Sequence, residues 1–368
     1  MTQDELLLHL IRLGVLNKTF ALPYEQSVDW DAMMDQAAEH GVIGFVWDAI
    51  NKLQTDQKPP RQQMINWGLS AEEVEEAYRQ KEKSLLKLVE LCRANSIRVL
   101  LLKGHGLSRL YPSPEHRYSS DIDIYLFGDY KKGNTVLAND QYQFGGRHSM
   151  FMFEGTNVEN HVTLIHTTTS IQKKIERYLE STMDNALLTE YGYYVLSPIP
   201  NLVFLLMHSL SHMDSRDVIS LKNIIDFHIF FSAHRSDIRP KELFSLLEEL
   251  KMTEAFELML QLCEWLSGDS VAEYHFCKIP SEDVDRAMSI IMKRQALPFY
   301  TPQMNMVERL SARYRRHKQM KWFYRYSPRK LNDRIMAGVR NEVSLGIQRL
   351  CGMTGSEGLS EGIRQKNI

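Results

Sequence analysis

The spacing of apolar residues predicts that the first 95 residues are helical. Leucines follow acidic residues at helical spacing in 1–13, and two further helical patterns cover 28–53 and 60–94. One face near the end of the last segment carries an apolar stripe of Leu85, Leu86, Leu88, Val89 and Leu91. Residues 1–95 are therefore expected to form an N-terminal helical region.

Patterns typical of strands lie between residues 96 and 198. The expected strands cover 99–102, 121–126, 150–154, 157–165 and 193–196, and the expected helices between them cover 130–139 and 171–188. From residue 199 the pattern is helical again, with breaks near Pro240, Gly268, Pro280 and 298–302. This order predicts an α+β protein with a β-sheet core at 96–198 and a C-terminal helical region at 199–368.

Two carboxylates interrupt the second expected strand. Side chains alternate between the two faces of a strand, so Asp121 and Asp123 share one face, and the apolar Ile122 and Ile124 share the other. Like charges this close are costly unless a cation lies between them. Oxygen ligands on a rigid strand suit Mg²⁺, with phosphate completing its shell. The pair therefore indicates a metal site for phosphate chemistry, although a solvated turn or strand edge would show the same spacing.

A glycine turn precedes the aspartates. The apolar run 97–102 ends at Lys103-Gly104-His105-Gly106, and residues at helical spacing follow, then a loop that leads to Asp121. Glycines at such a turn let backbone N–H groups approach an anion. The order strand, glycine turn, short helix, loop and acidic strand favours a phosphate site over a chance pair of aspartates.

Several short sequences occur in the order seen in known nucleotidyltransferases. They are Leu102-Lys103-Gly104, Tyr111-Pro112, Arg117, Asp121-Ile122-Asp123 and Glu159-Asn160-His161, with weaker matches at 31–42, 208–212 and 221–226. The chain thus resembles the superfamily typified by DNA polymerase beta, and more closely a bacterial family of uncharacterised nucleotidyltransferases. The resemblance implies a small mixed β-sheet core, an NTP substrate, and Mg²⁺, or Mn²⁺ in its place, as cofactor.

Glu159 is the candidate third carboxylate. It shares a strand face with His161, and pairing with the strand of Asp121 and Asp123 would bring all three carboxylates together. In that arrangement the aspartates bridge the metal ions, and Glu159 either binds a second ion or acts as general base. Glu159 could instead be a strand residue that faces the surface. Glu154, on the preceding strand, is the reserve candidate for the third carboxylate. We expect His161 to support the site rather than bind a metal.

Four residues are candidates for phosphate binding. Lys103 and Arg117 supply cations, Gly104 supplies the turn, and Ser120 supplies a hydroxyl. Lys103 and Arg117 could instead pair with Asp121 or lie in a solvated loop, and Ser120 could simply form the turn before the strand. His208 and His212 have the spacing of zinc ligands on a helix, but ordinary helix packing is the favoured interpretation.

Composition narrows the class of protein. The net charge of −2 argues against a protein that binds nucleic acid along its whole length, and four cysteines show no spacing for zinc or disulfides. No signal peptide and no apolar run of about 18 residues appears, so a cytoplasmic protein without a transmembrane span is expected. Basic and aromatic residues alternate in 309–340, which suits an anionic partner or, as we favour, packing on the protein's own surface.

Together these features predict a Mg²⁺-dependent nucleotidyltransferase. It would move a nucleoside monophosphate from an NTP to a hydroxyl of an unknown acceptor, which could be a small molecule, sugar, protein or RNA. The alternatives are a nucleotide-binding protein of the same fold without the chemistry, and a helical interaction module in which the acidic strand is incidental.

Overall fold

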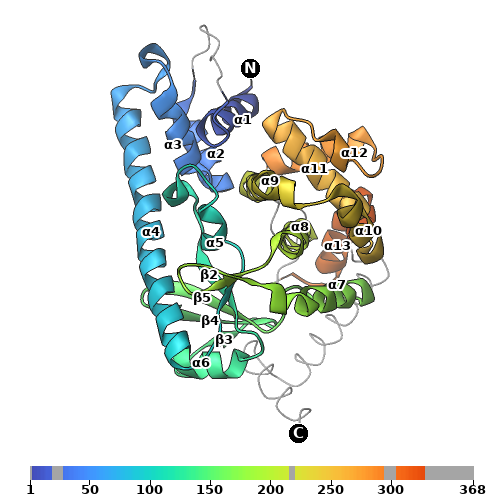
Figure 1. Cartoon of the computed structure of the whole chain (residues 1–368). Coiled ribbons are helices and arrows are strands. Elements are labelled where there is room, and N and C mark those ends of the chain that lie inside the picture. The colour runs from blue at the N-terminus through green and yellow to red at the C-terminus, as the bar shows by residue number, and fades with distance from the viewer. Residues whose placement is uncertain (1, 19–27, 215–219, 294–303, 328–368) are drawn as a thin grey trace.

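The computed structural model describes residues 2–18, 28–214, 220–293 and 304–327. Its N-terminal region is helical, as predicted, and the long α4 forms one side of the molecule (Figure 1). The pattern at 28–53 forms two helices rather than one, because Gly41 adopts a φ of +67° that ends the first. The four helices are α1 (Gln3–Gly14), α2 (Trp30–His40), α3 (Ile43–Lys52) and α4 (Arg61–Ala94).

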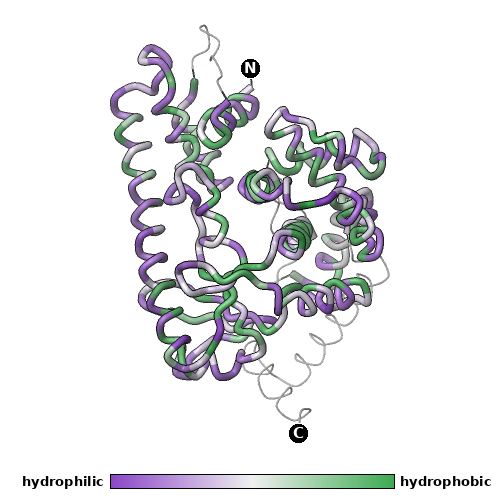
Figure 2. Tube along the Cα trace, viewed as in Figure 1, coloured by the Kyte–Doolittle hydropathy of each residue, from purple (hydrophilic) through white to green (hydrophobic). Residues whose placement is uncertain are grey.

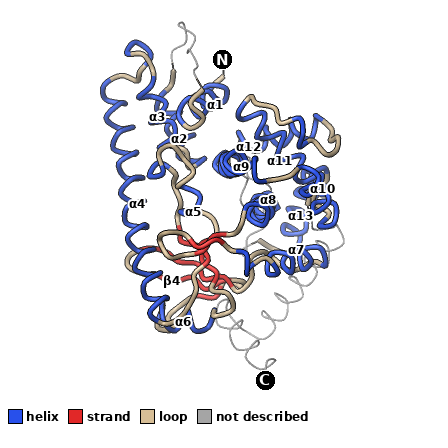
Figure 3. Tube along the Cα trace, in the orientation of Figure 1, coloured by secondary structure: helices blue, strands red, loops and turns tan. Residues whose placement is uncertain are grey.

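A mixed sheet of seven strands follows, in the order β3-β4-β5-β2-β1-β7-β6. Figure 3 shows the strands gathered beside α4. Strand β2 pairs in parallel with β5 and antiparallel with β1. Helices before and after this sheet make the fold α+β, as predicted. The strands are β1 (Leu100–Leu101), β2 (Asp121–Tyr125), β3 (Gln143–Phe144), β4 (His148–Phe153), β5 (Thr156–His161), β6 (Leu187–Leu188) and β7 (Tyr194–Val195); the helices among them are α5 (His105–Ser108), α6 (Tyr130–Ala138) and α7 (Ser170–Ser181).

Two predicted elements end earlier than expected. Strand β5 stops at His161, because Glu176 of α7 accepts the backbone N–H groups of Leu164 and Ile165 at 2.7 and 2.9 Å. Helix α7 stops at Ser181, because Thr182 bonds the backbone of the preceding turn and a 3-10 turn follows. The leucines at 187–188 then pair with β7 as a short strand instead of extending the helix.

The sheet presents its two faces to different partners. The apolar side chains of β2 pack on α4 and α6 in one hydrophobic cluster, which includes Leu88, Ile122, Ile124 and Val158. The opposite face carries Asp121 and Asp123 and looks toward α8 and α9, with α8 beside the strands in Figure 1. Alternation along β2 therefore separates the core from a polar, open face.

The C-terminal region is a set of helices that share a core with the N-terminal ones. Leucines of α1 pack in the same cluster as those of α9 and α11, and Arg12 donates hydrogen bonds to the carbonyls of Trp265 and Leu266. Apolar residues gather along α8 near the centre of the molecule (Figure 2). The helices are α8 (Pro198–Asp214), α9 (Leu221–His234), α10 (Pro240–Leu250), α11 (Thr253–Ser267), α12 (Ser281–Lys293) and α13 (Met306–Met320).

The breaks expected at Pro240, Gly268 and Pro280 lie at helix ends, whereas 298–302 lies outside the described residues.

Only part of the basic segment 309–340 is described. There Phe323 and Tyr326 are buried, and Arg325 pairs with Glu254 of α11 at 2.5 Å, as expected for packing on the protein's own surface. Among the described residues, no helix combines the length and the apolar character needed to cross a membrane.

Candidate active site

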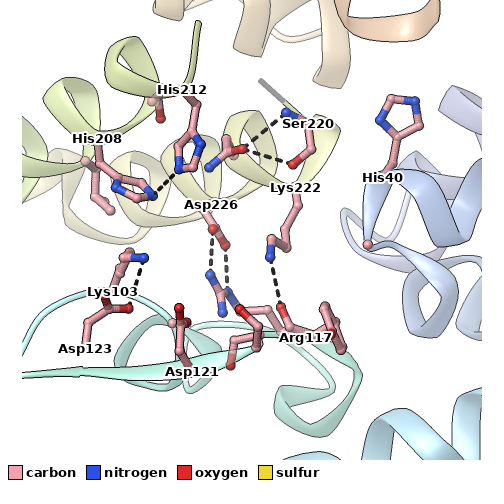
Figure 4. Close-up of a pocket in the computed structure, with 18 of the residues that line it drawn as sticks. His40, Lys103, Arg117, Asp121, Asp123, His208, His212, Ser220, Lys222 and Asp226 are labelled. Atoms are coloured by element: carbon pink, nitrogen blue, oxygen red, sulfur yellow. Dashed lines mark hydrogen bonds and ion pairs between the residues drawn. The ribbon is translucent and has the colours of Figure 1, made fainter. Parts of the chain in front are cut away.

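A cavity of about 310 Å³ lies between the open face of β2 and helices α8 and α9. Figure 4 shows His208 and His212 on one side, Asp121 and Asp123 on another, and His40 at the far end. The three weaker resemblance segments, 31–42, 208–212 and 221–226, all contribute to its lining. The polar lining consists of Glu39, His40, Lys103, Arg117, Tyr118, Ser119, Ser120, Asp121, Asp123, His208, Ser209, His212, Ser220, Lys222, Asn223 and Asp226.

The three predicted carboxylates come together. Oxygen atoms of Asp121, Asp123 and Glu159 lie within 4.8 Å of one another. The cause is register, since Asp123 of β2 lies directly opposite Glu159 of the parallel strand β5. Glu154, the reserve candidate, is excluded from this cluster, because it lies at the tip of the β4–β5 hairpin and pairs with Lys87 at 2.7 Å.

Asp123 is fully buried and held by a lysine and a histidine. Lys103 Nζ lies 3.0 Å from its Oδ2, and His161 Nε2 lies 3.0 Å from its Oδ1. Burial would raise the pKa of the Asp123 carboxyl, but Lys103 and His161 outweigh it and hold the pKa well below the usual value. Asp123 is therefore ionised at neutral pH.

His161 links two of the carboxylates. Its Nε2 also lies 3.5 Å from Glu159, and these contacts raise the pKa of His161 although burial opposes the change. Asp121 is less compensated: burial and the charge of Asp123 raise its pKa. Burial and the charge of Asp123 thus make the ionised form of Asp121 costly, and a cation bound beside it would relieve that cost.

Arg117 is anchored by a buried ion pair. Its Nε and Nη2 donate hydrogen bonds to Asp226 of α9 at 2.7 and 2.6 Å, and Tyr111 donates a third at 2.6 Å. Pairing with Asp121 was one of the alternatives to phosphate binding that the sequence left open, and the structure pairs Arg117 with Asp226 instead. Burial alone would lower the pKa of Arg117, but the charge and hydrogen bonds of Asp226 raise it by more. The net pKa is therefore raised, and the guanidinium stays charged. Arg117 lines the cavity, and its buried Nη1 has no hydrogen-bond partner among the described residues.

The remaining predicted phosphate residues also border the cavity. Gly104 has a φ of +62° and a ψ of −117°, a conformation that other residues rarely adopt, and exposed Ser120 precedes β2. The helix after the turn, α5, has only four residues, so the turn rather than a helix dipole brings the backbone close to the cavity.

Two lysines were not expected from the sequence. Burial lowers the pKa of Lys222 to about 8, and its Nζ donates a hydrogen bond to the carbonyl of Tyr118 at 3.3 Å beside the cavity. Burial likewise lowers the pKa of Lys81 to about 8, and this lysine of α4 holds the loop before β2 through the Oγ of Ser119 at 2.9 Å. Lys222 lies within a segment that resembles the family, whereas Lys81 has the spacing of an ordinary surface lysine.

His208 and His212 do not form a zinc site with a third ligand among the described residues. Their Nε2 atoms lie 3.0 Å apart, His208 stacks on Phe204, and burial holds the pKa of His208 well below its usual value. A neutral histidine packed in this way agrees with the favoured structural interpretation. The other grouping that could hold a metal joins Glu159 to His148 and His161.

Comparison with known proteins identifies the family of the chain. The model of a family described as "uncharacterised nucleotidyltransferase" matches residues 26–268, which include the cavity and the three carboxylates. No curated protein and no solved structure matches the chain. Because the match covers more than half of the sequence, the chain belongs to this family of uncharacterised nucleotidyltransferases.

Proposed function

We propose that the protein transfers a nucleoside monophosphate from an NTP to a hydroxyl group of an acceptor. The observation that carries this proposal is the cluster of three carboxylates beside a cavity lined by three cationic side chains. An oxygen of the acceptor would form a bond to the α-phosphorus as the bond from that phosphorus to the bridging oxygen of the β-phosphate breaks. Pyrophosphate then leaves, and the hydroxyl proton passes to a base.

The cations of the first cavity suit the triphosphate. Lys103, Lys222 and Arg117 line the cavity, and their positive charges can neutralise phosphate oxygens as negative charge develops on the leaving group. The volume of about 310 Å³ is at the lower end of the size range of small-molecule sites. The Arg117–Asp226 pair fixes the guanidinium before the nucleotide arrives.

The carboxylates fit a divalent cation such as Mg²⁺. Asp121, Asp123 and Glu159 offer hard oxygen ligands, and Oδ2 of Asp123 is buried without a hydrogen-bond partner among the described residues, although Lys103 lies near it. Bound there, the ion would neutralise the charge of the carboxylates and of the α-phosphate. Asp121 and Asp123 would hold it, while His161 keeps Asp123 and Glu159 oriented.

Glu159 is suited to two roles that the sequence left open. It can complete the ligand set, or it can take the proton from the attacking hydroxyl. Its pKa is lowered, because the hydrogen bond from His161 outweighs the effect of burial, so the carboxylate is ionised and able to accept a proton at neutral pH.

The test is a double substitution, Asp121→Asn with Asp123→Asn. With Mg²⁺ and a panel of NTPs and hydroxyl compounds, we expect pyrophosphate release by the wild type and a loss of at least about 100-fold in the variant. Glu154→Gln is the matched control, because that exposed carboxylate lies outside the cluster. Circular dichroism checks that all three proteins are folded.

Unchanged pyrophosphate release in the double variant would refute the proposal. Intact NTP affinity in the wild type without release across the whole panel would instead indicate a nucleotide-binding protein that lacks the chemistry. If no NTP binds with Mg²⁺ or Mn²⁺, a helical interaction module becomes the better interpretation.

A further inference from the structure

A second cavity, of about 660 Å³, adjoins the carboxylate cluster. It lies over strands β3, β4 and β5, and it shares Ser120 and Asp121 with the first cavity. Asp123 lines the first cavity and Glu159 lines the second. Asp121 therefore stands where the two spaces meet.

Sheet topology places the two cavities on different sides of Asp121. Strand β2 lies between β5 and β1, and the turn of Lys103 and Gly104 directly follows β1. The first cavity extends from that turn toward α8 and α9, whereas the second extends across β5 and β4. A molecule in one cavity and a molecule in the other would both reach Asp121, from the two sides of its strand.

The two cavities differ in charge. Lys103, Arg117 and Lys222 line the first, whereas no lysine or arginine among the described residues lines the second. The ionisable groups of the second that are negative at neutral pH are Asp121 and Glu159. A phosphate or carboxylate group placed there would meet like charge with no lysine or arginine in the lining to pair with, so the second cavity disfavours anions.

Apolar and amide groups form the rest of the second cavity. Met150 and Met152 are 37% and 60% exposed, and the strand register puts them on the face of Glu159, since Met150 pairs with Glu159 and Met152 with Asn157. Thioethers adapt to apolar and ring surfaces. Tyr142 adds a ring that is 40% exposed, and Gln141, Gln143 and Asn157 add neutral donors and acceptors.

The proposed reaction needs a hydroxyl compound on the side of Asp121 where the second cavity lies. In phosphoryl-type transfer the attacking and leaving oxygens lie roughly in line on opposite sides of the phosphorus. If the triphosphate lies among the cations of the first cavity, the hydroxyl must approach from the other side of the α-phosphate. The second cavity opens there, and Glu159 in its wall is placed to accept the hydroxyl proton.

We propose, on the basis of the function above, that the second cavity binds the acceptor. The acceptor is a hydroxyl compound without phosphate or carboxylate groups, and it presents an apolar or ring surface to Met150 and Met152. The base of the NTP is the competing occupant of this cavity in the test.

Methyl NMR tests which molecule contacts the methionines. The full chain is labelled with ¹³C in the methionine methyl groups and saturated with Mg²⁺ and a non-hydrolysable ATP analogue; Met150→Leu and Met152→Leu assign the two signals. Nucleosides and alkyl glycosides are then compared with nucleoside 5′-monophosphates and sugar phosphates. We expect nuclear Overhauser effects from the two methyl groups to the uncharged compounds and none to the adenine base. The uncharged compounds should also bind at least about tenfold more tightly than the phosphorylated ones.

A charge substitution gives a second readout. Met152→Lys adds a cation to the wall, so it should tighten the binding of the phosphorylated compounds by about tenfold while the affinity for the ATP analogue stays the same. Leu69→Lys is the matched control, because Leu69 is 56% exposed on α4 and lines neither cavity; it should change neither affinity. A change in the affinity for the ATP analogue in Met152→Lys alone would contradict the assignment.

Three NMR outcomes would overturn the proposal: contacts from Met150 and Met152 to the adenine base, tighter binding of the phosphorylated compounds by the wild type, or no contact with any uncharged compound. These outcomes are separate from failure of the proposed function. Uncharged compounds could contact Met150 in a protein that releases no pyrophosphate, and a protein that releases it could show contacts to the base alone.

Discussion

Replacing Asp226 with alanine removes three hydrogen bonds that join α9 to the loop before β2. Two come from Arg117 and one from Tyr111, and the substitution leaves a buried guanidinium, only 4% exposed, without its counter-ion. Removal of one partner from a buried pair costs about 3–5 kcal/mol. We therefore expect Asp226→Ala to lower the free energy of unfolding by that amount.

Urea unfolding at pH 7, followed by circular dichroism and tryptophan fluorescence, measures this loss. With a urea dependence of about 3 kcal/mol per molar, the midpoint should fall by about 1–2 M. Tyr111→Phe removes one of the three hydrogen bonds and should cost about 1–3 kcal/mol. The double variant Arg117→Met with Asp226→Leu replaces the charges with apolar groups of similar size, so it should recover most of the stability.

Two results would refute this reasoning. A loss below about 1 kcal/mol for Asp226→Ala would mean that the guanidinium finds water or another partner at little cost. A double variant that loses as much as the sum of Arg117→Met and Asp226→Leu would mean that the two side chains contribute independently, which the hydrogen bonds between them do not allow.

Two further predictions concern pH. Burial lowers the pKa of His105 to about 3, so folding keeps this histidine neutral. Its contribution to stability should be fully present above about pH 6.5 and should fall by about 3 kcal/mol by pH 4.5. Between pH 6.5 and 4.5 the urea midpoint should decline less in His105→Phe than in the wild type and in the control His234→Gln. Equal declines in all three proteins would exclude His105 as the source of the acid-induced loss of stability. Burial lowers the pKa of Lys222 to about 8, so this side chain loses its charge as the pH rises through 8. Calorimetry should therefore show NTP affinity weakening over that range in the wild type and staying constant in Lys222→Arg. A pH dependence that persists in the arginine variant would contradict a phosphate contact.

The carboxylate cluster was predictable because it follows from short-range geometry. Alternation along β2 places Asp121 and Asp123 on one face, and alternation along β5 places Glu159 and His161 on one face. The parallel pairing of the two strands then brings these side chains together. The expected helices and strands mostly appear for the same reason, since apolar periodicity is a local property.

Contacts between distant residues were less predictable. The partner of Arg117 lies 109 residues further along the chain, so local patterns offered only the nearby Asp121 or a solvated loop as alternatives to phosphate binding. Lys222 acquires its place beside the cavity only when α9 packs over the sheet. The ends of β5 and α7 likewise depend on backbone bonds to Glu176 and on the turn at Thr182, which apolar spacing does not record.

The register between β2 and β5 also limits how this chain can change in length during evolution. Glu159 lies three residues beyond the start of β5, and Val158 beside it points into the core under the sheet. A single residue gained or lost inside β5 before Glu159 would exchange those two orientations, burying the carboxylate and exposing the valine. Extra residues at the Glu154–Gly155 tip would leave both orientations intact. Length variation among descendants of this sequence should therefore accumulate at the tip and be absent from the strand.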